Sequence, residues 1–188
     1  EKSIKLFPNS PDSYANIAVL FRELKKFEEA REFTLKALKI KPNFTNAHYN
    51  LGLIYKDLKK YNQAILSTKK AIQLQPNFPE AHNSYGSILR ELGELDKSAI
   101  VFRKAIKYKT KYLDAYINLG TTYKYLGELE KAIEILYKSL EVNSNNLGMK
   151  IQALTDILIC EFMIGEFNQL PKHYKEITNQ LNLNKTLV

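Results

Sequence analysis

A repeat of 34 residues is the feature of this sequence that most restricts how the chain can fold. Three sets of positions keep that spacing: Pro8, Pro42 and Pro76; Ala30, Ala64, Ser98 and Ala132; Phe21, Tyr55, Leu89 and Tyr123. A unit of this length cannot bury its own apolar face, so its copies must stack on one another. The period therefore predicts a solenoid, an architecture whose extended surface usually binds other molecules.

Each unit is predicted to contain two helices. In residues 46–59 the apolar positions have the i, i+3, i+4 and i+7 spacing of one helix face: His48, Leu51, Gly52 and Tyr55. A second helix is predicted over residues 62–74, with these inward positions: Ala64, Ile65, Thr68, Ala71 and Ile72. Pro76 ends this helix, because proline disfavours helical geometry in the residue before it. Pro11 and Pro79 stand in the first turn of a following helix, where proline is tolerated.

Small residues are predicted to lie where the two helices of a unit cross, because they let the backbones approach closely. They occur once per unit on each helix: Ala18, Gly52, Gly86 and Gly120 on the first, and Ala30, Ala64, Ser98 and Ala132 on the second. Gly93 and Gly127 follow the first helix, where glycine adopts a left-handed conformation at little cost. Lys25 and Lys59 occupy the same place in earlier units. These two turns are therefore expected to need a different solution.

The composition argues against a membrane helix and against a disulfide framework. No apolar run approaches the roughly 18 residues that a membrane helix needs, and the most apolar stretch, residues 151–164, is interrupted by Gln152, Asp156 and Glu161. Cys160 is the only cysteine, so an intrachain disulfide is impossible and a cytoplasmic location is expected. Its apolar neighbours predict that Cys160 is a buried hydrophobic side chain.

The net charge of +8 raises the possibility of an acidic partner such as nucleic acid or acidic lipid. The lysines are not clustered, however, and recur once per unit on the second helix, at Lys36, Lys70, Lys104 and Lys138. That distribution favours a solvated outer face. Helical repeats that read RNA need base-reading side chains in every unit and a basic groove, and here the signs are mixed. Nucleic acid is therefore a disfavoured partner.

The repeat resembles the tetratricopeptide family, whose units have an aromatic residue, then Leu-Gly, then Tyr, with a later Ala, Phe, Ala and Pro. The second unit matches at His48, Leu51, Gly52, Tyr55, Ala64, Ala71 and Pro76. The resemblance implies an all-α, right-handed solenoid of helix-turn-helix units at residues 11–44, 45–78, 79–112 and 113–146. Residues 1–10 are interpreted as the end of a preceding repeat. Residues 147–188 are interpreted as a degenerate unit or capping helices, with four extra residues before Gly165.

In this family the face of each first helix that lies opposite the packing stripe lines a concave groove for peptides or partner helices. At about 100° per residue, this face carries the following candidate binding residues: Asn16, Arg22, Asn46, Tyr49, Asn50, Lys56, Asn83, Ser84, Arg90, Asn118, Lys124 and Tyr125. The asparagines at 16, 50 and 118 form a row that Ser84 interrupts. Such amides can pair with a peptide backbone, and the row resembles the asparagine ladder of the O-GlcNAc transferase family.

A second row on the same face is cationic, at Arg22, Lys56, Arg90 and Lys124. It could attract an acidic ligand. An acidic row runs beside it at Glu23, Asp57 and Glu91, so ion pairs between neighbouring units are the favoured interpretation. Exposed pairs of this kind contribute about 0–1 kcal/mol each.

The sequence favours a binding function without catalysis. Some tetratricopeptide domains clamp the carboxylate tail of chaperones with cations on successive first helices, but the matching places here hold residues such as Ala15, Val19, Glu80 and Ser84, so a chaperone tail is excluded as a partner. No catalytic pair, metal-ligand spacing or phosphate loop is found, and no cofactor is expected. We expect a protein- or peptide-binding scaffold. The alternative is the substrate-recognition arm of a larger enzyme, such as a glycosyltransferase.

Overall fold

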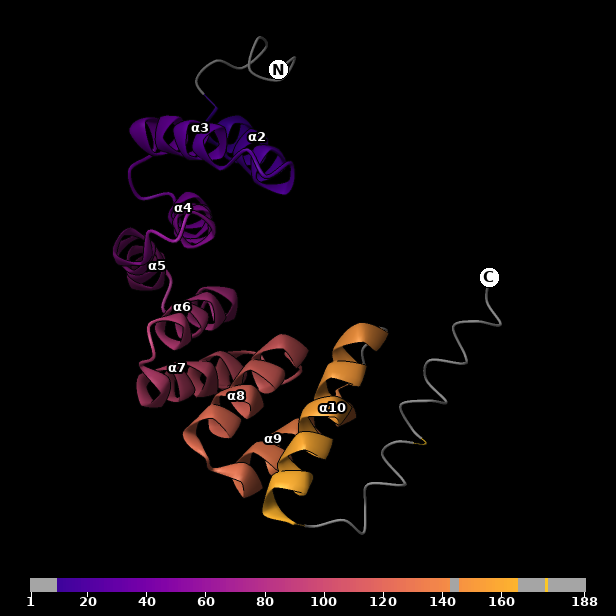
Figure 1. The fold of residues 1–188 in the computed structure, drawn as a ribbon. Coiled ribbons are helices and arrows are strands. Elements are labelled where there is room, and N and C mark those ends of the chain that lie inside the picture. The colour runs from indigo at the N-terminus through magenta and orange to yellow at the C-terminus, as the bar shows by residue number, and fades with distance from the viewer. Residues whose placement is uncertain (1–9, 143–145, 166–174, 176–188) are drawn as a thin grey trace, which may run out of the picture. The chain divides into compact units, whose positions relative to one another are not determined.

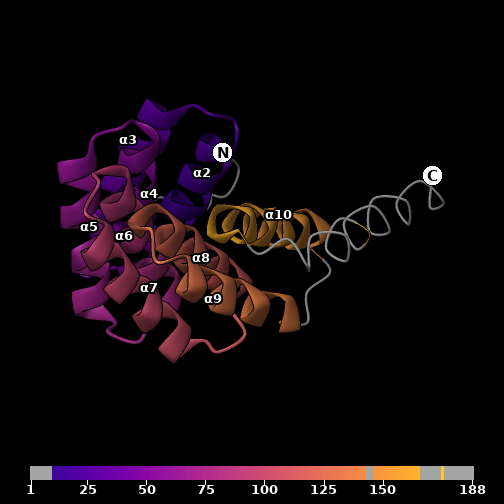
Figure 2. The same cartoon turned by 60° about the horizontal axis from the view of Figure 1, so that its bottom comes forward.

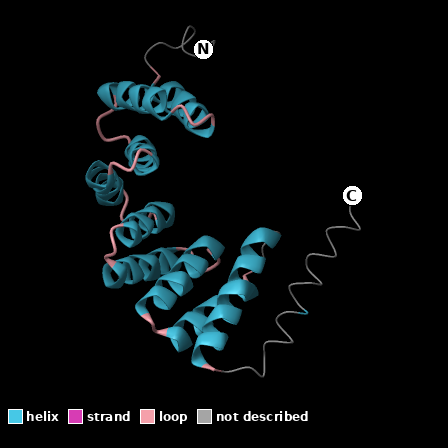
Figure 3. Cartoon of the chain, in the orientation of Figure 1, coloured by secondary structure: helices cyan, strands magenta, loops and turns pink. Residues whose placement is uncertain are grey.

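The computed structural model describes residues 10–142, 146–165 and 175, and within these ranges every regular element is a helix (Figure 3). The all-α prediction is thus confirmed. The chain divides into two compact units at Leu92 and Gly93. The N-terminal unit holds α2 (Pro11–Glu23), α3 (Phe27–Ile40), α4 (Thr45–Asp57), α5 (Tyr61–Leu74) and α6 (Pro79–Glu91) (Figure 1). The C-terminal unit holds α7 (Leu95–Tyr108), α8 (Leu113–Leu126), α9 (Leu129–Glu141) and α10 (Leu147–Ile164).

In the N-terminal unit each helix packs against the next one along the chain, and the first helices α2, α4 and α6 also contact one another in turn. Because a first helix touches several neighbours, its buried face is wider than one stripe. On α4 the buried residues include Ala47 and Ile54, both 0% exposed, whereas His48 and Tyr55 are only partly buried. The sequence therefore placed Leu51 and Gly52 correctly on the buried face of α4. The predicted stripe was too narrow, because it left out Ala47 and Ile54.

Proline positions and histidine hydrogen bonds define where the first helices begin. Pro11 and Pro79 are the first residues of α2 and α6, as predicted. His48 and His82 each place Nε2 on the carbonyl oxygen of a proline in the preceding loop, at 2.8 Å from Pro42 and 2.9 Å from Pro76. The ring N–H donates a hydrogen bond to a loop carbonyl oxygen that accepts none from the N–H groups of a helix. These contacts give both histidines a structural role, although His82 is buried and His48 is only partly buried.

Small residues do allow close helix crossings in the α2–α3, α4–α5 and α8–α9 pairs. Ala18, Ala30 and Ala64 are 0% exposed. A Cβ atom added to Gly52 would lie 3.4 Å from the carbonyl oxygen of Ala64, and one added to Gly120 would lie at the same distance from that of Ala132. The second helix therefore approaches the first closely enough to touch it with its backbone, which only small side chains permit.

The turns after the first helices all use one left-handed residue, including those where the sequence has lysine. Gly93 and Gly127 have φ of 76°, as expected. Lys25 and Lys59 have φ of 58° and 57°, so the prediction that these two turns need a different solution was wrong. The helix ends impose the same backbone on every unit, and the lysines bear the strain of a left-handed L-residue, about 1–2 kcal/mol.

Replacing Lys25 or Lys59 by glycine is expected to raise the free energy of unfolding by about 0.5–1 kcal/mol. Glycine removes the left-handed strain but adds roughly 0.5–1 kcal/mol of backbone entropy to the unfolded chain. Urea unfolding measures the difference. Lys104→Gly, at an exposed interior position of α7, should instead lose about 1 kcal/mol. Equal losses in all three variants would contradict the strain argument.

The C-terminal unit is built around α8, with α10 lying alongside α8 and α9 (Figures 1 and 2). In the described part of this unit the core has two clusters, one around Phe102, Leu119 and Cys160 and the other around Ile117, Leu136 and Ile157. Cys160 is 0% exposed, and burial raises the pKa of its thiol. The prediction of a buried apolar side chain is confirmed.

The predicted extra turn is present in α10, which has 18 residues against 14 in α8 and ends at Gly165 with φ of 88°. The cap or degenerate unit proposed for residues 147–188 extends beyond residue 165, and that part lies outside the described residues apart from residue 175. Of residues 1–10, interpreted as the end of a preceding repeat, residues 1–9 also lie outside them. In the described ranges no helix is both long and apolar enough to span a membrane.

Candidate functional site

The predicted binding residues of the N-terminal unit lie on α2, α4 and α6, which follow one another through mutual contacts. We call this surface the first-helix face and define it by the following residues: Asn16, Arg22, Asn46, Tyr49, Asn50, Lys56, Asn83, Ser84 and Arg90. Its helices are held in place by their second helices, since α2 packs on α3 and α4 on α5. The three remaining candidates, Asn118, Lys124 and Tyr125, belong to α8 in the C-terminal unit.

The amides of the first-helix face differ in availability. Asn16 and Asn46 are exposed and Asn50 is half-buried, and within the described ranges none of the three side chains has a hydrogen-bond partner. Asn83 and Asn118 already take part in interactions within the protein. A primary amide offers two donors and an acceptor, so the available amides lie on α2 and α4.

Ser84 and Tyr49 contribute less polar surface than the sequence implied. Ser84, which interrupts the amide row, is only 5% exposed, and its hydroxyl oxygen is buried with no partner in the described structure. Tyr49 packs its ring against that of Phe78, with ring centres 4.9 Å apart. The centre of this face therefore combines an aromatic surface with a buried hydroxyl.

The cationic row mostly ties one first helix to the next. Arg22 Nε donates to Asp57 Oδ2 at 2.6 Å, an ion pair between α2 and α4 that confirms the favoured interpretation of adjacent opposite rows. Lys56 Nζ donates to the Ser87 hydroxyl on α6 at 3.1 Å. Arg90 is engaged within the protein as well.

The Lys56 ammonium is a partly buried cation of this face. Burial lowers the pKa of its ammonium below the ordinary value of 10.5, although Asp57 and Glu91 favour the charged form. Its hydrogen-bond acceptor, Ser87, is neutral. A partly desolvated ammonium with a neutral partner gains more from an anionic ligand group than a solvated one does.

The Arg22–Asp57 pair should give a coupling free energy of about 0.5–1 kcal/mol in a double-mutant cycle. The two side chains are 34% and 22% exposed, so solvent screens them only in part. Arg22→Gln, Asp57→Asn and the double variant would be unfolded in urea at low and at 1 M salt. The coupling should shrink at high salt because the Debye length falls to about 3 Å. A coupling of zero at low salt would mean that the contact contributes nothing.

In the C-terminal unit the predicted binding residue Lys124 is bound to a buried carboxylate that the sequence analysis did not identify as functional. Asp156 of α10 is 1% exposed and forms an ion pair with Lys124. Its Oδ2 also accepts hydrogen bonds from Thr121 at 3.1 Å and from Gln152 at 3.0 Å. Lys124 is therefore occupied, and the contact joins α8 to α10. The available signal was a single acidic residue inside the apolar stretch 151–164.

Tyr125 has a different environment from Lys124. Tyr125 is 62% exposed, and the Lys124 ammonium lies 5.8 Å from the centre of its ring. The structure thus leaves an aromatic surface at the end of α8. Within the described ranges no group of three metal-ligating side chains comes together.

Three family models match the sequence in successive segments. A model described as "Tetratricopeptide repeat" matches residues 45–78 and 113–146. A second, described as "TPR repeat", matches residues 19–59. A third, again described as "Tetratricopeptide repeat", matches residues 1–32 and 68–98. No curated protein sequence matches the chain.

Solved structures with the same fold cover nearly the whole chain. A crystal structure of MamA protein is 28% identical, with a TM-score of 0.78 and 94% of each chain covered. MamA from Desulfovibrio magneticus RS-1, residues 41 to the end, is 19% identical, with a TM-score of 0.79 and coverage of 92% of this chain and 95% of that one. YrrB, described as a TPR protein with an unusual peptide-binding site, is 17% identical, with a TM-score of 0.71 and coverage of 100% and 97%.

Proposed function

Since the chain belongs to the tetratricopeptide repeat family, we propose that it is a non-catalytic scaffold that binds an extended peptide segment of a partner protein on its first-helix face. The observation that carries the proposal is the set of amides without a partner on α2 and α4, at Asn16, Asn46 and Asn50. Amides in a row along stacked helices pair with successive peptide groups of an extended chain whatever its side chains are.

Lys56 adds a preference to this binding mode. Its ammonium is partly desolvated and its hydrogen-bond partner is neutral, so an acidic side chain of the peptide would be bound beside Asn50. Tyr49 offers its ring as an apolar surface next to the amide row. The preferred ligand is therefore an extended segment with a carboxylate near an apolar residue.

A chaperone tail remains excluded in this proposal. A clamp for a terminal carboxylate needs several uncommitted cations, whereas Arg22 is paired with Asp57 and Arg90 is engaged within the protein. YrrB, which shares the fold, is described as having a peptide-binding site. That description concerns the same class of function as the one proposed here.

The test is a comparison of two double variants. Peptides that bind the wild-type chain would first be selected from a random library, and their dissociation constants measured by calorimetry. Asn16→Ala with Asn50→Ala should weaken binding about tenfold or more, because two hydrogen bonds of about 0.5–1.5 kcal/mol each are lost. The matched control is Asn43→Ala with Asn62→Ala, at two exposed positions away from the first-helix face.

Circular dichroism would verify that both double variants keep the helical content of the wild type. Selected peptides that bind the Asn16/Asn50 variant as tightly as the control variant would exclude the first-helix face as their site. Selected peptides that lose affinity on Lys56→Gln as well would support the acidic preference.

A further inference from the structure

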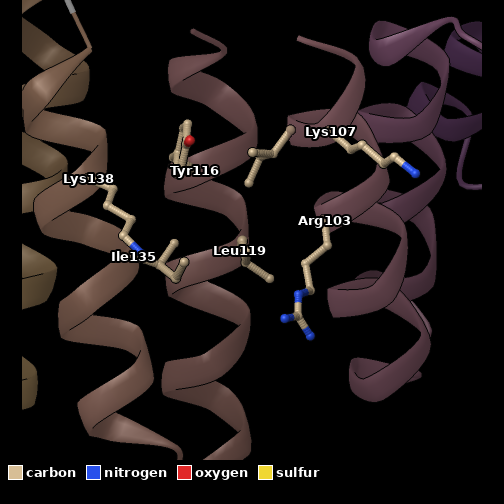
Figure 4. Close-up of a pocket in the computed structure, with 7 residues that line it drawn as sticks. Arg103, Lys107, Tyr116, Leu119, Ile135 and Lys138 are labelled. Carbon is tan, nitrogen blue, oxygen red and sulfur yellow. The ribbon is translucent and has the colours of Figure 1, made fainter. Parts of the chain in front are cut away.

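A pocket of about 280 Å³ lies in the C-terminal unit between α7, α8 and α9 (Figure 4). Its lining divides into an apolar part and a cationic part. The apolar part consists of Ile106, Leu119 and Ile135 together with the ring of Tyr116. The cationic part consists of Arg103, Lys107 and Lys138. None of the twelve predicted groove residues lines this pocket, and two of its three walls are second helices.

Two of the three cations around the pocket, Arg103 and Lys107, are not balanced by carboxylates in the described part of the protein. Lys138 forms an ion pair with Glu134 one turn earlier in α9, at 2.5 Å. Arg103 and Lys107 are exposed and lie four residues apart on α7, hence on one helix face. Within the described ranges neither of these two side chains has a carboxylate partner or a hydrogen bond. The lining therefore carries an excess of positive charge above an apolar floor.

The floor of the pocket is part of the buried core, and the size of the pocket limits what it can hold. Leu119 is 1% exposed and belongs to the core cluster of the unit, against which Ile106 and Ile135 also pack. A volume of about 280 Å³ is just below the range of about 300–1,000 Å³ found for small-molecule sites. It is large enough for one large apolar side chain, which favours an anchor residue of a peptide over a cofactor.

We propose that this pocket binds an acidic peptide segment of a partner protein, with one large apolar side chain on the floor and flanking carboxylates on Arg103 and Lys107. Arg103 and Lys107 lie one turn apart on α7, and Figure 4 shows their charged ends directed to different places, so carboxylates on either side of one anchor residue can each reach one of them. Charge-assisted hydrogen bonds of this kind are stronger than neutral ones. The site is distinct from the first-helix face and extends the proposed function to a second peptide.

Calorimetry with a defined probe tests the proposal. The probe is a nonapeptide with a central phenylalanine, two acidic residues on either side, and uncharged blocked ends. Arg103→Glu with Lys107→Glu should weaken its binding roughly tenfold or more, since two charge-assisted contacts become repulsive. The control, Lys39→Glu with Lys104→Glu, has the same change in net charge at exposed positions outside the pocket. It should bind within about twofold of the wild type.

Two further measurements locate the anchor. Replacing the central phenylalanine of the probe by glycine should weaken binding about as much as the pocket variant does, because the apolar contact is lost. Methyl NMR spectra should show the largest shifts at Ile106 and Ile135. The Asn16/Asn50 variant should bind the probe like the wild type, so failure of one site is distinguishable from failure of the other.

Several outcomes would overturn the proposal. One is equal weakening in the pocket variant and the control variant, which would mean attraction to the net charge alone. Another is binding that does not depend on the central phenylalanine. A third is that the wild type does not bind the probe but does bind vesicles of anionic phosphatidylglycerol, and that the pocket variant loses this vesicle binding. That result would assign the pocket to a lipid surface.

Discussion

Replacing Asp156 by alanine is expected to lower the free energy of unfolding by about 3 kcal/mol or more. The carboxylate is buried and accepts hydrogen bonds from Thr121 and Gln152 in addition to its ion pair with Lys124. The Lys124 side chain is itself only 15% exposed. Removing one partner of such a pair leaves the other charge buried without compensation, which typically costs about 3–5 kcal/mol. Urea unfolding followed by circular dichroism measures the loss.

Two companion variants separate the cause of that loss. Asp156→Asn keeps a polar group of the same shape and loses the charge, so its stability should fall between those of the wild type and Asp156→Ala. Lys124→Met combined with Asp156→Leu removes both charges. It should be more stable than Asp156→Ala alone, because a buried pair can be replaced by apolar residues with little loss. If Asp156→Ala unfolded at the wild-type urea midpoint, the contact between α8 and α10 would not depend on this network.

The second large effect is expected from Gly120→Ala, which should destabilise the chain by about 1–3 kcal/mol through overpacking. A Cβ atom at this position would lie 2.5 Å from Cγ and 2.7 Å from Cδ2 of Leu136. Leu136 is 0% exposed and sits in a core cluster with Ile117 and Ile157. It cannot move away without disturbing that cluster. The gain in helix propensity from glycine to alanine, about 1 kcal/mol, offsets only part of the clash.

The matched control is Gly52→Ala, two repeats earlier in the chain. Gly52 faces a threonine, whereas Gly120 faces Leu136. A Cβ atom at Gly52 would lie 2.3 Å from the hydroxyl oxygen of Thr68, which is buried and has no hydrogen-bond partner in the described structure. Rotation of this side chain could place the hydroxyl on the carbonyl of Ala64. The equivalent Thr34 already donates to Ala30 in this way, at 2.8 Å.

The expected result for Gly52→Ala is therefore a change in the free energy of unfolding of less than about 1 kcal/mol. The α2–α3 pair supports this value, because Ala18 occupies the place of Gly52 there and is fully buried opposite Thr34. Both glycine variants would be compared in the same urea series. Equal losses in Gly52→Ala and Gly120→Ala would show that the backbone crossing, and not the facing side chain, sets the cost.

Local rules predicted much of the fold from particular residues. Proline positions predicted the start of α2 and α6, and the glycines at 93 and 127 predicted the left-handed residue after the first helices. They failed at Lys25 and Lys59, because the packing of two helices imposes a backbone that the residue type alone disfavours. The rules also predicted too narrow a buried face for α4, because the apolar stripe of a helix does not show how many other helices pack against that helix.

The candidate site was predictable only as a set of residues facing the same way. Helical periodicity placed Asn16, Asn50 and Lys56 on one face, and adjacent opposite charges predicted the Arg22–Asp57 pair. Periodicity does not tell which of these side chains the protein itself uses. Lys124 is occupied by Asp156, whereas Asn16 and Asn50 have no partner in the described ranges.

The sequence alone determined the all-α repeat architecture, because a period of 34 residues with helix-spaced apolar positions leaves stacking as the way to bury them. Only the tertiary structure decided which polar groups are occupied and where a pocket opens. Those outcomes depend on side chains from different helices meeting, as Lys124 meets Asp156 across 32 residues of chain and as Arg103 and Lys138 line one cavity. A repeat pattern specifies which way each side chain faces on its own helix, whereas a site depends on distances between helices.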